Sequence, residues 1–136
     1  MKHLKIIDQN IKEHLETLNL IDDEMKKKIL KVSKEISKSI KKGGTIFWCG
    51  NGGSASTANH FAVDMTKNAK VNVDSFSNDD LITCYSNDYG YENWIANVLR
   101  YQANKKDLVI FASVSGNSPN LVNGVKYCRK NSIDTF

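Results

Sequence analysis

Two short segments of the sequence combine residue types that can bind a ligand, and the second of them can bind a phosphate group without a charged side chain. One is Gly50-Asn51-Gly52-Gly53-Ser54, and the other is Ser113-Val114-Ser115-Gly116-Asn117-Ser118. Glycines let backbone N–H groups approach a ligand closely, and serine hydroxyls add further donors. Either segment alone also fits an ordinary tight turn. The two together favour a site for a phosphate monoester.

His60 and Asp64 are the titratable residues best placed for chemistry beside the first segment. In a helix their i, i+4 spacing puts both side chains on one face, about 6 Å apart at Cβ. This is metal-ligand spacing, and it also suits an acid–base pair that moves a proton next to a carbonyl. A surface histidine is an open alternative here. We take His3 and His14 as surface or packing residues.

A third polar segment, 86–92, is expected to form a loop between two helices. Its Asn87 and Asp88 are able to accept hydrogen bonds from sugar hydroxyls and donate to them. Ordinary Asn-Asp turn chemistry explains the same composition equally well.

The elements around these segments predict an α/β fold. Buried strands are expected at 45–49 and 108–112, and each runs directly into one of the two loops. The other expected elements are helices to about Lys67, at 79–86, at 92–104 and at about 119–130, and weaker strands at 71–76 and 133–136. Alternating strands and helices indicate a parallel sheet covered on both faces, with ligands bound beyond the carboxyl ends of its strands.

Two amphipathic helices are expected before this body. The first has the apolar stripe Leu4, Ile7, Ile11, Leu15 and Leu18. The second is expected to be capped by Asp22 and to bury Met25, Ile29, Val32, Ile36 and Ile40. We expect one domain over 1–136, with N-terminal helices at 1–43 and the α/β body at 44–136. An end inside a strand would leave an unpaired sheet edge, so we also expect that a C-terminal part is missing.

Composition narrows the class of protein. The 136 residues have a formal net charge of +4, much of it from lysines of the second helix, which we interpret as a solvated face rather than a nucleic-acid patch. The three cysteines, Cys49, Cys84 and Cys128, are too far apart for a disulfide framework and suggest buried thiols in a reducing cytoplasm. We expect neither a membrane span nor a signal peptide.

A nicotinamide enzyme is one competing interpretation. Gly50, Gly52 and Ala55 fit the G-x-G-x-x-A fingerprint, and Asp74 follows about 20 residues later. That fingerprint normally opens a domain, whereas two helices precede it here. It also leaves the serine-rich segment without a role, so we do not favour it.

Taken together, the segments resemble the sugar isomerase (SIS) domain family, and within it the phosphoheptose isomerases. The matching stretches are GNGGSAS at 50–56, HFAVDM at 60–65, SNDYGYENW at 86–94 and SVSGNS at 113–118. The resemblance implies a three-layer SIS-type fold and a cytoplasmic homotetramer. It also implies aldose–ketose isomerisation of sedoheptulose 7-phosphate, for the heptose of lipopolysaccharide or capsule.

The resemblance also implies roles for single residues. Asn51, Gly52 and Gly53 match the substrate loop, with Ser54 beside them, and Asn87 and Asp88 match a pair that contacts the sugar. The phosphate cradle is matched by Ser113, Val114, Ser115 and Ser118. His60 and Asp64 match a zinc-binding histidine and a carboxylate that is both metal ligand and acid–base group, with one zinc ion per subunit.

Two departures from the family pattern keep an alternative function open. The family has Glu at the position of Asp64, and its remaining metal and proton-transfer residues, a glutamine and a histidine, lie on a C-terminal helix absent here. A misplacement of about 1 Å can cost roughly 100-fold in rate. The alternative is a non-catalytic SIS module that binds a phosphosugar or a protein partner.

Overall fold

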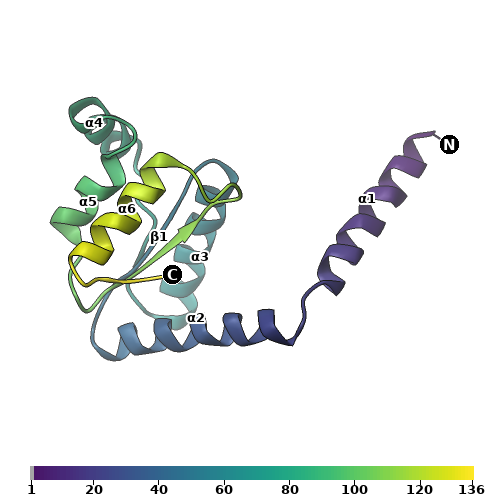
Figure 1. The fold of residues 1–136 in the computed structure, drawn as a ribbon, viewed down its shortest axis with the longest axis horizontal. Coiled ribbons are helices and arrows are strands. Elements are labelled where there is room, and N and C mark those ends of the chain that lie inside the picture. Colours follow the sequence, from purple (N-terminus) through teal and green to yellow (C-terminus); the bar gives the residue numbers. More distant parts are fainter. Residues whose placement is uncertain (1) are drawn as a thin grey trace. The chain divides into compact units, whose positions relative to one another are not determined.

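The computed structural model describes residues 2–136 and, from His3 onward, their side chains. The chain divides into two compact units, one that ends at Lys34 and one from Glu35 to Phe136 (Figure 1). The single domain over 1–136 therefore stays a prediction. Among the described residues, no helix is both long and apolar enough to cross a bilayer.

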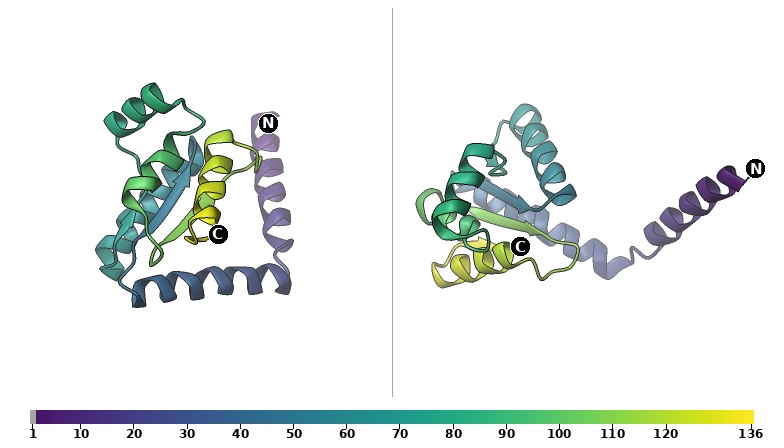
Figure 2. Two further views of the ribbon diagram at one scale, coloured as in Figure 1. Left: turned by 60° about the vertical axis from the view of Figure 1, so that its left-hand side comes forward. Right: turned by 90° about the horizontal axis from the view of Figure 1, so that it is seen from above.

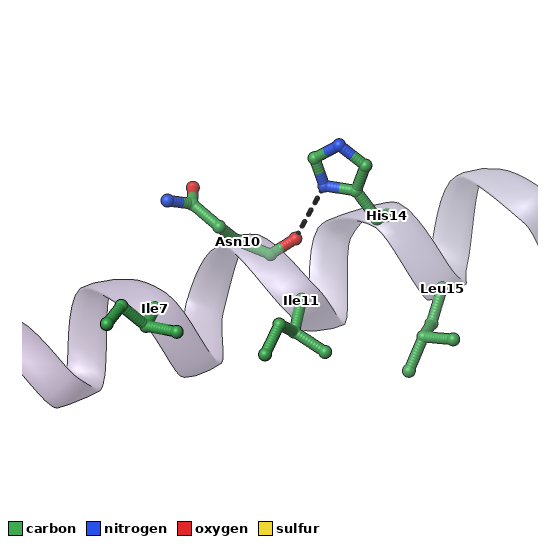
Figure 3. Close-up of a pocket in the computed structure, with 5 residues that line it drawn as sticks. All are labelled: Ile7, Asn10, Ile11, His14 and Leu15. Carbon is green, nitrogen blue, oxygen red and sulfur yellow. Dashed lines mark hydrogen bonds between the residues drawn. The ribbon is translucent and has the colours of Figure 1, made fainter.

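The first unit consists of helix α1 (Lys2–Asn19) and the first part of α2 (Asp23–Lys41). As expected, Asp22 caps α2, since its Oδ1 accepts the Met25 N–H at 2.8 Å. A shallow hollow on α1 is lined by Ile7, Asn10, Ile11, His14 and Leu15, and the three apolar side chains among them project from one side of the helix (Figure 3). These three apolar side chains are between 54% and 56% exposed.

The buried stripe predicted for the second helix is only partly correct. Met25 and Ile29 are 47% and 59% exposed, while Val32, Ile36 and Ile40 are partly buried. The apolar periodicity identified the stripe but not what covers it. The two helices leave the apolar residues between Leu4 and Ile29 largely open to solvent.

The second unit is built on a four-stranded parallel sheet in the order β2-β1-β3-β4. Its strands are β1 (Ile46–Gly50), β2 (Val73–Asp74), β3 (Leu108–Ala112) and β4 (Asp134–Thr135). Its helices after α2 are α3 (Gly53–Ala69), α4 (Asp79–Tyr89), α5 (Trp94–Gln102) and α6 (Pro119–Lys130). The predicted α/β class and parallel sheet are confirmed, although β2 is shorter than the expected strand over 71–76.

The strand order places α3 and α6 on opposite faces of the sheet. The connection from β1 through α3 moves outward to β2, and the connection from β3 through α6 moves the other way, to β4. Because such crossovers are right-handed, reversing the direction reverses the face that the helix covers. Figure 2 shows the sheet between these two helices in its right-hand view. The carboxyl ends of β1 and β3 therefore flank a topological switch point.

The core fills the face of the sheet that α5 and α6 cover. It includes Phe47 and Cys49 of β1 and Val109 of β3, packed against inward-facing residues of α5 and α6: Trp94, Ile95, Val98, Leu99, Leu121 and Cys128. On the other face, Trp48 packs edge-on against Phe61 of α3, with ring centroids 4.3 Å apart. Helix α5 therefore turns one apolar face toward the sheet.

The cysteines divide into two kinds. Cys49 and Cys128 are buried as expected, but Cys84 lies exposed on α4, so the prediction of three buried thiols is wrong for that residue. Burial raises the pKa of the Cys49 thiol well above its ordinary value and raises the pKa of Cys128 to about 12. The thiolate is the reactive species, so both buried thiols are held in an inert form near neutral pH.

We therefore expect one of the three thiols to react rapidly with a disulfide reagent such as DTNB at pH 8. Cys84→Ser should remove this fast phase, whereas Cys49 and Cys128 should react only when a denaturant is added. Absorbance at 412 nm, read with and without guanidinium, checks this. Three equally fast thiols in the native protein would contradict the buried placement.

Candidate functional site

The first loop is shaped by two glycines at the end of β1. A Cβ on Gly50 would lie 2.7 Å from the backbone carbonyl carbon of Ser54, so a side chain has no room there. Gly52 has φ 54° and ψ −122°, a conformation that residues with a Cβ rarely adopt. The chain therefore turns sharply into α3, which begins at Gly53. Ser54 lies in its first turn, partly buried.

The second loop gathers three serine hydroxyls between β3 and α6. Ser113 Oγ lies 3.5 Å from Ser115 Oγ and 3.4 Å from Ser118 Oγ. The backbone N–H of Gly116 donates to Ser113 Oγ at 3.1 Å, and that of Asn117 donates to Ser115 Oγ at 3.2 Å. A hydroxyl that accepts a backbone N–H keeps its own hydrogen available for another acceptor.

The same loop ends at the N-terminus of α6. Ser118 is the N-cap and Pro119 occupies the first turn, and no side chain among the described residues caps this helix end. The N-terminus of a helix carries partial positive charge, which favours an anion. Val114 is fully exposed, and its apolar side chain has no donor to offer.

The sheet register brings the two loops side by side. Gly50 pairs with Ala112, so β1 and β3 end level and both loops start from the same edge. Asn51 Nδ2 donates to Asn120 Oδ1 at 3.0 Å, and Asn120 Nδ2 donates back to Asn51 Oδ1 at 2.8 Å. The Tyr91 hydroxyl also donates to Asn51 Oδ1, at 3.2 Å. One hydrogen-bonded group thus joins the loops to the segment before α5.

His60 and Asp64 form a pair on α3, as their spacing predicted. His60 Nε2 lies 3.4 Å from Asp64 Oδ2, and their side chains are 80% and 54% exposed. The two side chains converge closely enough to supply two ligands to one metal ion. A catalytic zinc site usually has three protein ligands. Within residues 2–136, no group of three or more His, Cys, Asp or Glu side chains is arranged to hold a metal, so the pair fits such a site only in part.

Asn87 and Asp88 do not lie in a loop as expected. Helix α4 continues to Tyr89, and both residues belong to its last turn. Asn87 Nδ2 donates to Asp88 Oδ1 at 3.0 Å, and Asp88 Oδ2 lies 3.9 Å from Cys84 Sγ. The helix ends only where Gly90 takes φ 80°, so turn-forming residues marked the right region but not the right boundary.

Sequence reasoning missed Asn120 and Tyr91. Asn120 directly follows the Pro119 that marked the start of α6, and it is 1% exposed. A polar side chain at the start of a helix gives no sign of burial until its partner is known. Tyr91 lies inside the polar segment 86–92, but exposed tyrosines are common and its sequence position alone does not indicate a hydrogen bond to Asn51.

The sequence matches a model of a known protein family over almost its full length. The model described as "SIS domain" matches residues 9–135, nearly the whole chain. The chain belongs to the SIS domain family. The resemblance of the four sequence segments is thereby confirmed at the level of the family.

Curated relatives of this SIS chain include phosphoheptose isomerases. That of Aliarcobacter butzleri (strain RM4018) is 35% identical over 122 residues, which cover 85% of this chain and 65% of the relative. That of Cytophaga hutchinsonii is 36% identical over 121 residues, covering 85% of this chain and 63% of the relative. The chain thus spans slightly less than two thirds of either relative.

A solved structure of a phosphoheptose isomerase from Francisella tularensis has the same fold. It matches with a TM-score of 0.91 at 20% identity, over 99% of this SIS chain and 74% of the other. At that identity the likeness supports the fold alone. The predicted SIS-type architecture, a parallel sheet flanked by helices and preceded by two N-terminal helices, is confirmed.

The serine loop yields a direct test. The double variant Ser115→Ala, Ser118→Ala should weaken the binding of a phosphosugar by about 1–3 kcal/mol, because phosphate oxygens lose hydroxyl donors. Isothermal titration calorimetry measures this. Thr83→Ala is the matched control, since its hydroxyl bonds Asp79 O within α4 at 2.8 Å. Unchanged affinity in the serine variant would contradict the phosphate assignment.

Proposed function

We propose that this SIS chain is part of a phosphoheptose isomerase that interconverts sedoheptulose 7-phosphate and a heptose 7-phosphate. The observation that supports this best is the pairing of two donor-rich loops at the switch point of the sheet, with His60 and Asp64 on the helix that follows the first loop. The names of the curated relatives favour the same substrate.

The site separates binding from proton transfer. The serine loop would hold the phosphate through hydroxyl and amide donors, while Asn51 and the glycine loop would contact the sugar. The phosphate end is remote from the reacting carbons, so its binding energy orients the carbonyl end toward α3.

Asp64 is the group we assign to proton transfer. Its carboxylate would remove the proton from the carbon beside the carbonyl, giving an enediol as the carbonyl oxygen gains a proton. The carboxylic acid then returns this proton to the former carbonyl carbon, while the hydroxyl on the first carbon loses a proton that balances the one gained by the carbonyl oxygen. The ketose thus becomes an aldose without any net oxidant or reductant. A bound zinc ion would supply an electrophile for the developing oxyanion, with His60 and Asp64 as two of its ligands.

The Asp64 series tests this assignment. Asp64→Asn should abolish turnover, because the amide is not a base, yet leave phosphosugar binding nearly intact. Asp64→Glu should preserve or raise activity, because it restores the longer side chain of the family pattern. A coupled isomerase assay on full-length protein with added zinc measures both, and Asp79→Asn, an exposed carboxylate in the first turn of α4, serves as control.

The same assay distinguishes the alternative function. The exposed His60–Asp64 pair and its short carboxylate also suit a non-catalytic SIS module that binds a phosphosugar or a protein partner. If wild type and Asp64→Glu are both inactive while phosphosugar binding is normal, the isomerase proposal fails in favour of that module. Stoichiometric zinc in the purified protein would favour the enzyme.

We also propose that the protein is a cytoplasmic homo-oligomer, a tetramer, acting in the synthesis of envelope heptose. The exposed stripe of α1, with Ile7, Ile11 and Leu15 more than half exposed, favours a further surface that covers it. Helices with such a stripe bury it by packing between subunits.

Light scattering tests the oligomer. The wild-type mass should be four times that of one chain, and Ile7→Glu with Ile11→Glu should lower it, because two charges would then have to be buried. Gln9→Glu, at an exposed position of α1 that does not line this hollow, should leave the mass unchanged. A monomeric full-length protein would rule the proposal out.

A further inference from the structure

Asn120 is the most deeply buried polar side chain in contact with either loop. It is 1% exposed, yet it belongs to the first turn of α6, directly beyond the serine loop. Burying an amide is costly unless its donors and acceptor are paired. Asn120 meets this cost through its pair of hydrogen bonds with Asn51, which lies in the other loop.

The hydrogen bonds around Asn51 leave its side-chain amide free to donate to a ligand but not to accept from one. Its Oδ1 has two lone pairs, and these accept from Asn120 Nδ2 at 2.8 Å and from the Tyr91 hydroxyl at 3.2 Å. Its Nδ2 has two hydrogens, and one of them is given to Asn120 Oδ1 at 3.0 Å. What remains for a ligand is a single N–H donor with a fixed direction.

We propose that Asn120 and Tyr91 are positioning residues that fix the Asn51 amide as a donor toward an oxygen of the bound sugar phosphate. The inference rests on the proposed function and adds residues that neither loop motif contains. The reciprocal amide pair prevents Asn51 from rotating to present its carbonyl, and it ties the glycine loop to the serine loop. A preoriented donor costs less conformational entropy on binding than a free one.

Calorimetry with two probes tests the role. Asn120→Ala should weaken binding of sedoheptulose 7-phosphate about 10- to 100-fold, because Asn51 loses its orienting partner. Affinity for inorganic phosphate should change by less than about twofold, since the serine loop is intact. Tyr91→Phe, at a 55% exposed position that tolerates the change, should weaken sugar-phosphate binding about 2- to 10-fold.

Asn97→Ala is the matched control. Asn97 is also a buried asparagine, 8% exposed, but its Nδ2 donates to the backbone oxygen of Asn93 at 3.1 Å, at the start of its own helix. This variant should lower the melting temperature and leave the affinity for the sugar phosphate unchanged.

A double-mutant cycle separates positioning from general structural support. If Asn120 acts through Asn51, then Asn120→Ala should have no further effect on sugar-phosphate affinity in an Asn51→Ala background. In the ligand-free full chain, NMR should show one Asn51 side-chain amide hydrogen protected from exchange, and Asn120→Ala should remove that protection.

The outcomes are distinguishable. If neither Asn120→Ala nor Tyr91→Phe weakens binding of the sugar phosphate, this inference is overturned and the proposed function is not. The same holds if Asn120→Ala still weakens that binding in the Asn51→Ala background. If Asn120→Ala does not fold, Tyr91→Phe and the protection of the Asn51 amide decide. A wild type that binds no sugar phosphate, with the Asn51 amide protected, would overturn the proposed function and this role with it.

Discussion

The parallel pairing of β1 with β3 is the constraint on which the candidate site depends. Its register sets Gly50 opposite Ala112, so both strands end at the same level. The register is held at the other end by Asp107, a buried carboxylate that accepts the Thr45 N–H and the Asn104 N–H, both at 2.7 Å. A slip of one residue would turn one strand over relative to the other and move its loop away from the neighbouring loop. A buried acid at the start of the strands thus determines the geometry of a site at their ends.

Much of this arrangement follows from local sequence signals. The apolar runs 45–49 and 108–112 are short and rich in β-branched or aromatic residues, and glycine or serine follows each of them at once, which identified both strands and both loops. The His60–Asp64 pair followed from helical spacing alone. These features are local, because a strand–turn–helix unit is specified by about 20 consecutive residues.

The remaining features depend on contacts between distant segments. Asn120 pairs with a residue 69 positions earlier, and its own surroundings in the sequence do not indicate a partner. The end of α4 at Tyr89 rather than Ser86 reflects the placement of Gly90, not the Asn-Asp pair that suggested an earlier turn. Similarly, the periodicity of Met25 and Ile29 identifies an apolar stripe, but periodicity does not say which surface covers it.

The two halves of the site differ in how completely the described residues build them. The loop half is hydrogen-bonded and anchored on a fully buried side chain, whereas His60 and Asp64 project into solvent. Proton abstraction next to a carbonyl is favoured by a site from which water is excluded, because charge interactions there are stronger and the base is not solvated. Under the proposed function, binding of a phosphosugar would therefore require only the loops, whereas turnover would require a further surface over α3. That requirement links activity to whatever covers this helix, and it explains why affinity and catalysis are expected to respond to different substitutions.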